Sequence, residues 1–176
     1  HVRTELLPKH GGRLVKSLGD GMLLEFEDPR AATAYALEQQ RHMSSINIGV
    51  PTGLMIWLRI GLHVADVVVD DIDVLGSGVN LAARLATLAE PGETVASVEL
   101  RDALSDGVDA SFEDLGEQWL KHLQGSVRAY RVHAPESGGL RLYQRGSNDA
   151  TALQPGIAVM PLAVHFNAAE ERWLGE

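Results

Sequence analysis

A Gly-Asp-Gly triplet at residues 19–21 separates two short apolar runs, at 14–18 and 22–26. An Asp-Gly pair between two such runs is one of the strongest sequence signals for a β-hairpin. A hairpin here, and a second one predicted further along, contradict an open, doubly wound parallel sheet, which needs regular alternation of single strands and helices.

The segments that follow alternate between predicted helices and strands. Asp28 and Pro29 are typical of a helix N-cap and first turn. Further elements are predicted as a helix end at 4–10, β-rich runs at 54–63 and 67–70, a helix at 79–89, a strand at 93–97, a helix at 98–104, and strands at 111–115 and 127–132. This order predicts an α+β fold: a ferredoxin-like βαββαβ-type antiparallel sheet with helices on one face.

The composition changes after residue 133, where Pro, Ser and Gly become frequent. We interpret 1–133 as the first domain, 134–154 as a linker, and 155–176 as the start of a following domain or a C-terminal extension. Residues 157–161 form one further predicted strand with no partner nearby in the sequence. The first residue is His1 rather than Met, so we interpret the sequence as a fragment.

The charge balance limits the partners of this chain of 176 residues. Fifteen Lys and Arg face 24 Asp and Glu, which gives a formal charge of -9 and argues against binding a nucleic-acid backbone. Nucleotides remain compatible, because a divalent cation can bring phosphate to an acidic site. The chain has no Cys, which excludes disulfides and thiolate chemistry. Charges interrupt its most apolar stretch, at 46–69, so no membrane segment is predicted and we expect a cytoplasmic protein.

Two patterns around the first hairpin have competing interpretations. Lys16 lies between Leu14 and Leu18 on one face of the predicted strand. It fits either an edge-strand lysine that keeps the sheet soluble or a ligand contact. Asp20 fits the first central position of a type I′ turn as well as it fits a functional carboxylate.

Two further patterns lie between residues 70 and 84. Asp70, Asp71 and Asp73 could bind a cation, but a solvated turn explains three neighbouring carboxylates equally well. Asn80 and Arg84 are four residues apart, so they occupy one helix face and could grip a common anion. The plainer alternative is an ordinary polar face of a surface helix.

Taken together, these patterns resemble the catalytic domain of class III adenylyl/guanylyl cyclases. The resemblance covers about residues 1–133. It rests on five ordered blocks: Gly11-Gly12-Arg13-Leu14-Val15-Lys16-Ser17-Leu18-Gly19-Asp20-Gly21; Arg59-Ile60-Gly61-Leu62-His63; Asp73-Val74-Leu75-Gly76-Ser77-Gly78-Val79-Asn80-Leu81-Ala82-Ala83-Arg84-Leu85, followed by Leu88-Ala89-Glu90-Pro91-Gly92; Phe112-Glu113-Asp114-Leu115-Gly116; and Val127-Arg128-Ala129-Tyr130-Arg131-Val132.

The resemblance implies conversion of ATP to 3′,5′-cyclic AMP and pyrophosphate in intracellular signalling. Arg84 would neutralise charge on the α-phosphate and Asn80 would orient the ribose. Lys16 and Asp73 would read the base, and a Lys donor with an Asp acceptor matches adenine N1 and its 6-amino group. Guanine reverses both groups, so the resemblance favours ATP. Lys121 is a further phosphate-binding candidate, although its spacing to Tyr130 does not fix the match.

The resemblance also implies a two-metal site for Mg²⁺ or Mn²⁺, with Asp20 as one ligand. The family's other metal carboxylate lies in an N-terminal strand that this sequence lacks, which leaves the activity of the fragment open. The site would form between two chains in a head-to-tail homodimer. The alternative is a non-catalytic, cyclase-like dimerisation or sensory module.

Overall fold

The protein is described by a computed structural model that covers residues 6–18, 21–65, 68–69, 74–75, 77–104, 109–121, 123, 125–135, 157–161 and 164–165. Its helices are α1 (Leu7–Lys9), α2 (Pro29–Ile46), α3 (Ser77–Leu88) and α4 (Val98–Ala103), with a 3₁₀ turn at Thr52–Leu54. Its strands are β1 (Gly12–Leu18), β2 (Gly21–Phe26), β3 (Trp57–Leu62), β4 (Val64–Ala65), β5 (Val68–Val69), β6 (Val74–Leu75), β7 (Thr94–Ser97), β8 (Ser111–Trp119), β9 (Ser126–His133), β10 (Ile157–Pro161) and β11 (Val164–His165).

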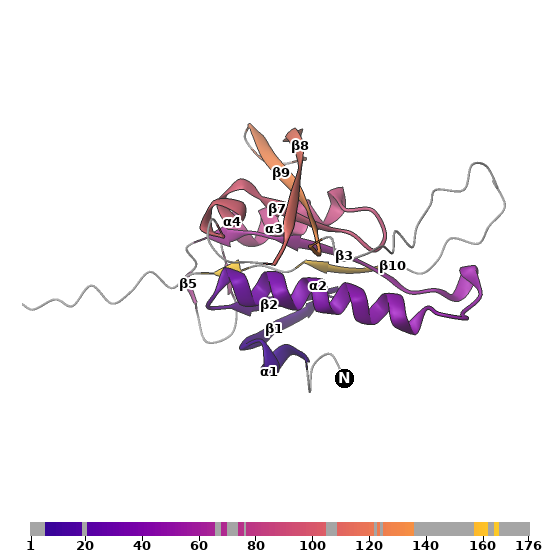
Figure 1. Ribbon diagram of the computed structural model, residues 1–176. Coiled ribbons are helices and arrows are strands. Elements are labelled where there is room, and N and C mark those ends of the chain that lie inside the picture. The colour runs from indigo at the N-terminus through magenta and orange to yellow at the C-terminus, as the bar shows by residue number, and fades with distance from the viewer. Residues whose placement is uncertain are drawn as a thin grey trace, which may run out of the picture.

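A five-stranded sheet in the order β10-β3-β7-β9-β8 forms the centre of the molecule (Figure 1). The α+β class is therefore confirmed. The strands are not all antiparallel, however: β7 runs parallel to β3. The reason is the connection through α3, since a helical crossover returns the chain to the same end of the sheet. The last strands, β9 and β8, pair antiparallel, as the sequence predicted.

The strand predicted at 157–161 is formed with those bounds as β10. The sequence suggested no partner for it, yet it pairs in parallel with β3, with Ile157 opposite Trp57. Its partner lies about a hundred residues earlier in the chain, and hydrophobic patterning carries no information about pairing over that distance. The division of the chain into domains remains a prediction.

The two long helices pack on opposite faces of β3, rather than on one face as expected. Leu58, Ile60 and Leu62 are buried in the main core with side chains of α2. Gly61 points the other way, against the backbone of α3. Successive residues of a strand face opposite sides, so β3 is covered on both faces.

The first hairpin, β1–β2, forms a two-stranded sheet of its own. Leu24 and Phe26 bury one side of it in the main core, and the rings of Phe26 and Tyr35 lie 5.2 Å apart. Burial raises the pKa of the Tyr35 hydroxyl well above its ordinary value. The hairpin is thus attached to the body through side-chain packing.

Helix α2 begins as its sequence predicted. Asp28 adopts an extended conformation and its Oδ1 accepts a hydrogen bond of 2.8 Å from the amide of Arg30, with Pro29 in the first turn. After the helix ends, the Asn47 side chain closes the loop that leads to β3. Its Nδ2 donates to the carbonyl of Ile56 (2.8 Å), and the amide of Ile56 donates to its Oδ1 (3.0 Å).

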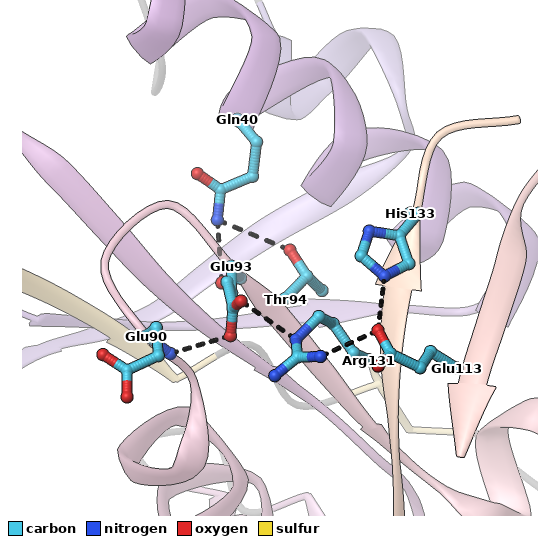
Figure 2. A network of polar contacts seen from close by, with 7 residues as sticks. All are labelled: Gln40, Glu90, Glu93, Thr94, Glu113, Arg131 and His133. Atoms are coloured by element: carbon cyan, nitrogen blue, oxygen red, sulfur yellow. Dashed lines mark hydrogen bonds and ion pairs between the residues drawn. The ribbon is translucent and has the colours of Figure 1, made fainter. Parts of the chain in front are cut away.

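A polar network fixes the turn between α3 and β7 (Figure 2). The Gln40 Nε2 of α2 donates to the carbonyl of Glu93 (2.9 Å), and the Glu93 carboxylate accepts from the amide of Glu90 (3.0 Å). Arg131 on β9 contacts Glu93 at 2.9 Å and donates to Glu113 on β8 at 2.7 Å. The hydrogen bonds from Arg131 and His133 lower the pKa of the Glu113 carboxyl. One network therefore ties α2, the α3–β7 turn and the β8–β9 pair together.

No helix in the described part of the chain is long and apolar enough to cross a membrane.

Candidate functional site

Helix α3 presents the two polar side chains that the sequence singled out. Asn80 is exposed and Arg84 is half-buried. Both lie within the regular helix Ser77–Leu88, so their spacing of four residues places them on one helix face. The opposite side of α3 carries Ala82 and Ala86, which are fully buried.

Neither of these side chains is engaged by the parts of the chain that the structure describes. No hydrogen bond or ion pair there involves the side chain of Asn80 or Arg84, although the Arg84 carbonyl accepts a hydrogen bond of 2.6 Å from Thr87 Oγ1. A guanidinium that is half-buried and carries no internal counter-ion is a suitable group for an external anion. The α3 face is therefore a candidate anion-binding surface.

Lys16 lies on β1 and is half-buried. The β1–β2 register shifts between Leu14 and Lys16, so that Leu14 lies opposite Leu24 and Lys16 opposite Leu23. This irregularity interrupts the simple alternation that would place Leu14, Lys16 and Leu18 on one face. A bulge of this kind re-aims the side chains next to it.

A small apolar cluster joins the hairpin to α3. Leu23 of β2 and Ala82 of α3 are fully buried against each other, with Val15 of β1 and Val79 of α3 packed beside them. Val15 is the neighbour of Lys16, and Val79 is the neighbour of Asn80. The structure thus brings the lysine-bearing hairpin and the Asn-Arg helix side by side within one chain.

The remaining predicted site residues are not brought together by the described structure. Asp20 and Asp73 lie outside the described residues. Lys121 is exposed in the turn between β8 and β9, and the structure does not test its role. No group of three or more His, Asp or Glu side chains that could hold a metal ion occurs among the described residues.

The structure has a cavity away from α3. A cavity of about 340 Å³ lies between α2, the start of β7 and the end of β9. It is lined by Leu37, Gln40, Arg41, Ser44, Ser45, Ile48, Gly92, Thr94, Val132, His133 and Ala134. None of the predicted site residues that the structure describes lines it, and Asn80 and Arg84 lie on α3, which does not border it.

Two features near the site were missed from the sequence. His63, buried just after β3, makes a 2.8 Å hydrogen bond through Nδ1 with Ser97 Oγ, and Glu99 Oε2 lies 3.7 Å from the same nitrogen. Gly61 allows the backbone of α3 to lie directly on β3. The only available signal was the Gly-Leu-His run at the end of a predicted strand, which does not reveal what the glycine faces.

Known proteins are similar to this chain in sequence and in fold. Putative adenylate cyclase 3 of Rhizobium meliloti (strain 1021) is 35% identical over 162 residues, which cover 91% of this chain and 27% of that protein. The crystal structure of an adenylate/guanylate cyclase/hydrolase from Silicibacter pomeroyi aligns with a TM-score of 0.66 and 33% identity, over 77% of this chain and 79% of that one. CyaB of P. aeruginosa, an adenylyl cyclase, shares the fold with a TM-score of 0.56 at 20% identity, over 77% of this chain and 78% of that one. No family model matches the chain.

The chain belongs to the class III adenylate/guanylate cyclase family and is a cyclase catalytic domain. It spans less than a third of the length of the Rhizobium relative.

Proposed function

We propose that this domain converts ATP to 3′,5′-cyclic AMP and pyrophosphate. The single observation that carries the proposal is the α3 face. Asn80 and Arg84 lie on one side of this helix, and its opposite side is buried. The hairpin that bears Lys16 contacts the same helix through Leu23 and Ala82. Family membership supplies the reaction class.

In the proposed reaction the ribose 3′-oxygen attacks the α-phosphorus of ATP. The 3′-hydroxyl loses its proton, a new P–O bond closes the ring, and the bond to the β-phosphate breaks to release pyrophosphate. Charge develops on the phosphoryl oxygens, so the protein contributes mainly positioning and electrostatic stabilisation. Arg84 would bind the α-phosphate oxygens, and Asn80 would hold the ribose.

Lys16 and Asp73 would select adenine. The lysine would donate to adenine N1, and the carboxylate would accept from the 6-amino group. With guanine, a protonated N1 would face the lysine and a 6-oxo group would face the carboxylate. Buried polar groups left unpaired in this way can discriminate by several kcal/mol.

The proposal includes Mg²⁺ or Mn²⁺ in a two-metal site, with Asp20 as one ligand. Carboxylate oxygens are the ligands that such cations prefer, and the bound ions would neutralise charge on the phosphates. A single carboxylate is too few to hold them, so the site needs further ligands besides Asp20. The active unit would be a head-to-tail homodimer, and Lys121 is a further candidate contact for phosphate.

The test is cyclic AMP formation from ATP with Mg²⁺ or Mn²⁺, measured for this chain and for the protein extended upstream of His1. Arg84→Ala should reduce kcat at least about a hundredfold. Arg41→Ala, which removes an exposed arginine from α2, is the matched control and should leave kcat unchanged. If the extended protein forms no cyclic AMP, the proposal fails in favour of the non-catalytic dimerisation or sensory module. A preference for GTP would refute ATP as the preferred substrate together with the base assignment, and would leave the cyclase reaction in place.

A further inference from the structure

Gly61 lies at a close contact between β3 and the backbone of α3. A Cβ built at this position would lie 2.1 Å from the carbonyl oxygen of Ala82 and 2.5 Å from the amide nitrogen of Ala86. Both are backbone atoms of a regular helix, so no change of side-chain conformation can make room. Of all residues, only glycine fits between β3 and α3 at this depth.

Helix geometry relates the side of α3 that contacts the sheet to the side that carries Asn80 and Arg84. Two residues along an α-helix correspond to a rotation of about 200°. Asn80 and Arg84 each lie two positions from Ala82, so they lie on the side of α3 that faces away from Gly61. Burial agrees with this, because Ala82 and Ala86 are fully buried whereas Asn80 is exposed.

The contact therefore sets how far Asn80 and Arg84 project from the sheet. A helix moves as a rigid unit, so any outward displacement at Ala82 and Ala86 passes directly to the opposite face. Relieving a 2.1 Å contact to an ordinary carbon–oxygen distance needs a shift of at least roughly 1 Å. Misplacing reacting groups by about 1 Å can cost about a hundredfold in rate.

We propose that Gly61 is a positioning residue for the nucleotide site, because its missing side chain sets the depth of α3 and thereby the location of Asn80 and Arg84. The inference rests on the proposed cyclase function for its kinetic consequence. Its structural consequence is independent of that function.

The primary variant is Gly61→Ala in the active, extended protein. We expect kcat to fall about 10- to 100-fold, with a smaller change in KM, since the displaced groups act on the ribose and the α-phosphate during bond formation. A merely structural role would lower the melting temperature and leave kcat per folded molecule unchanged.

The matched control is Met43→Ala, which removes a buried side chain of α2 on the other face of β3. It should destabilise the protein by about 2–5 kcal/mol and keep kcat within about twofold at temperatures where the protein is folded. Equal kcat values for Gly61→Ala and Met43→Ala under those conditions would overturn the inference.

A second variant covers the case in which Gly61→Ala does not fold. Ala86→Ser adds one atom to a fully buried side chain of α3 at the residue whose backbone forms this contact, and we expect a smaller fall in kcat of about 3- to 10-fold, in proportion to a smaller shift. An Ala86→Ser protein with unchanged kcat and an unmoved helix would contradict the proposal.

The structural readout separates this inference from the proposed function. Crystal structures of the wild type and of whichever of these variants folds should show α3 further from β3 in the variant. If the wild type makes no cyclic nucleotide but the helix moves, the function is wrong and the positioning role stands. If the wild type is active and the helix stays in place, the positioning role is wrong.

Discussion

The two halves of the candidate site are held in the molecule by different means. Helix α3 lies against the five-stranded sheet at a contact so close that only Gly61 fits. The β1–β2 hairpin, which carries Lys16, forms a separate sheet and is attached through the side chains of Leu24 and Phe26. Backbone contact fixes a position closely, whereas side-chain packing tolerates small adjustments. We therefore expect the helix to control rate and the hairpin to control which base is accepted.

The largest expected effect concerns the attachment of the hairpin. Phe26→Ala removes a side chain that is 1% exposed and should lower the free energy of unfolding by about 3–5 kcal/mol. Because the hairpin has its own sheet, hydrogen exchange should accelerate in β1 and β2 more than in β3 and β7.

Leu85→Ala is the matched control on the α3 side, where the leucine is fully buried. It should cost about 2–5 kcal/mol and accelerate exchange in α3 and β7 instead. If both variants accelerate hydrogen exchange equally in all of these elements, the hairpin and the α3 side unfold as one unit. The proposed difference between the two halves is then wrong.

A second prediction concerns base selection. Lys16→Glu should weaken discrimination against GTP by about tenfold, because it replaces the donor expected opposite adenine N1 by an acceptor. The ratio of kcat/KM for ATP and GTP measures it, with Arg30→Glu on exposed α2 surface as the charge-matched control. An unchanged ratio in Lys16→Glu would remove the hairpin from base recognition.

A third and smaller effect concerns the start of α2. The buried side of this helix packs in the same core as the hairpin side chains Leu24 and Phe26. Asp28→Ala removes the acceptor for the amide of Arg30 and should cost about 1 kcal/mol, measured by denaturant unfolding. Asp28→Asn retains an acceptor and should recover most of the loss. Similar losses in both variants would assign the effect to the charge of the carboxylate rather than to its hydrogen bond.

The smallest effect concerns Glu38 on α2, which accepts hydrogen bonds from Lys9 at 2.7 Å and contacts His10 at 2.7 Å. These contacts, led by the bond from Lys9, lower the pKa of the Glu38 carboxyl. A lowered folded-state pKa adds stability above the unfolded value of about 4.3, and that stability is lost as the pH falls through the folded value.

Glu38→Gln should therefore cost about 0.5 kcal/mol at pH 7, since solvent screens such pairs, and progressively less as the pH falls below about 4.3. Melting temperatures of both proteins across that range measure it. A difference that does not shrink as the pH falls would assign the effect to packing of α1 rather than to charge, and would strengthen the contrast between the two halves.

The sequence predicted the parts of this architecture that depend on local signals. The Asp-Gly hairpin, the Asp28 cap, and the Asn80–Arg84 spacing depend on residues within a few positions of one another, and the described structure places β1, β2, α2 and α3 accordingly. Asp20 and Asp73, which lie outside the described residues, stay predictions.

The features that were missed depend on residues far apart in the chain. The parallel pairing of β3 with β7 and β10 and the contact of Gly61 with α3 arise from tertiary packing. Hydrophobic periodicity reports which face of an element is buried, but not what covers it. The same limit explains why α2 and α3 were expected on one face of the sheet.

Asn47 gives the loop at 48–55 a property useful for engineering. Its side chain hydrogen-bonds both backbone groups of Ile56, so the base of the loop is closed independently of its tip. Ile48 and Leu54, near the two ends of the loop, are largely exposed. Each doubling of loop length costs only about 0.6 kcal/mol in closure entropy. A reporter domain inserted between Gly49 and Pro51 should therefore leave both flanking elements in register, which makes this loop the natural attachment point for following the domain inside a longer protein.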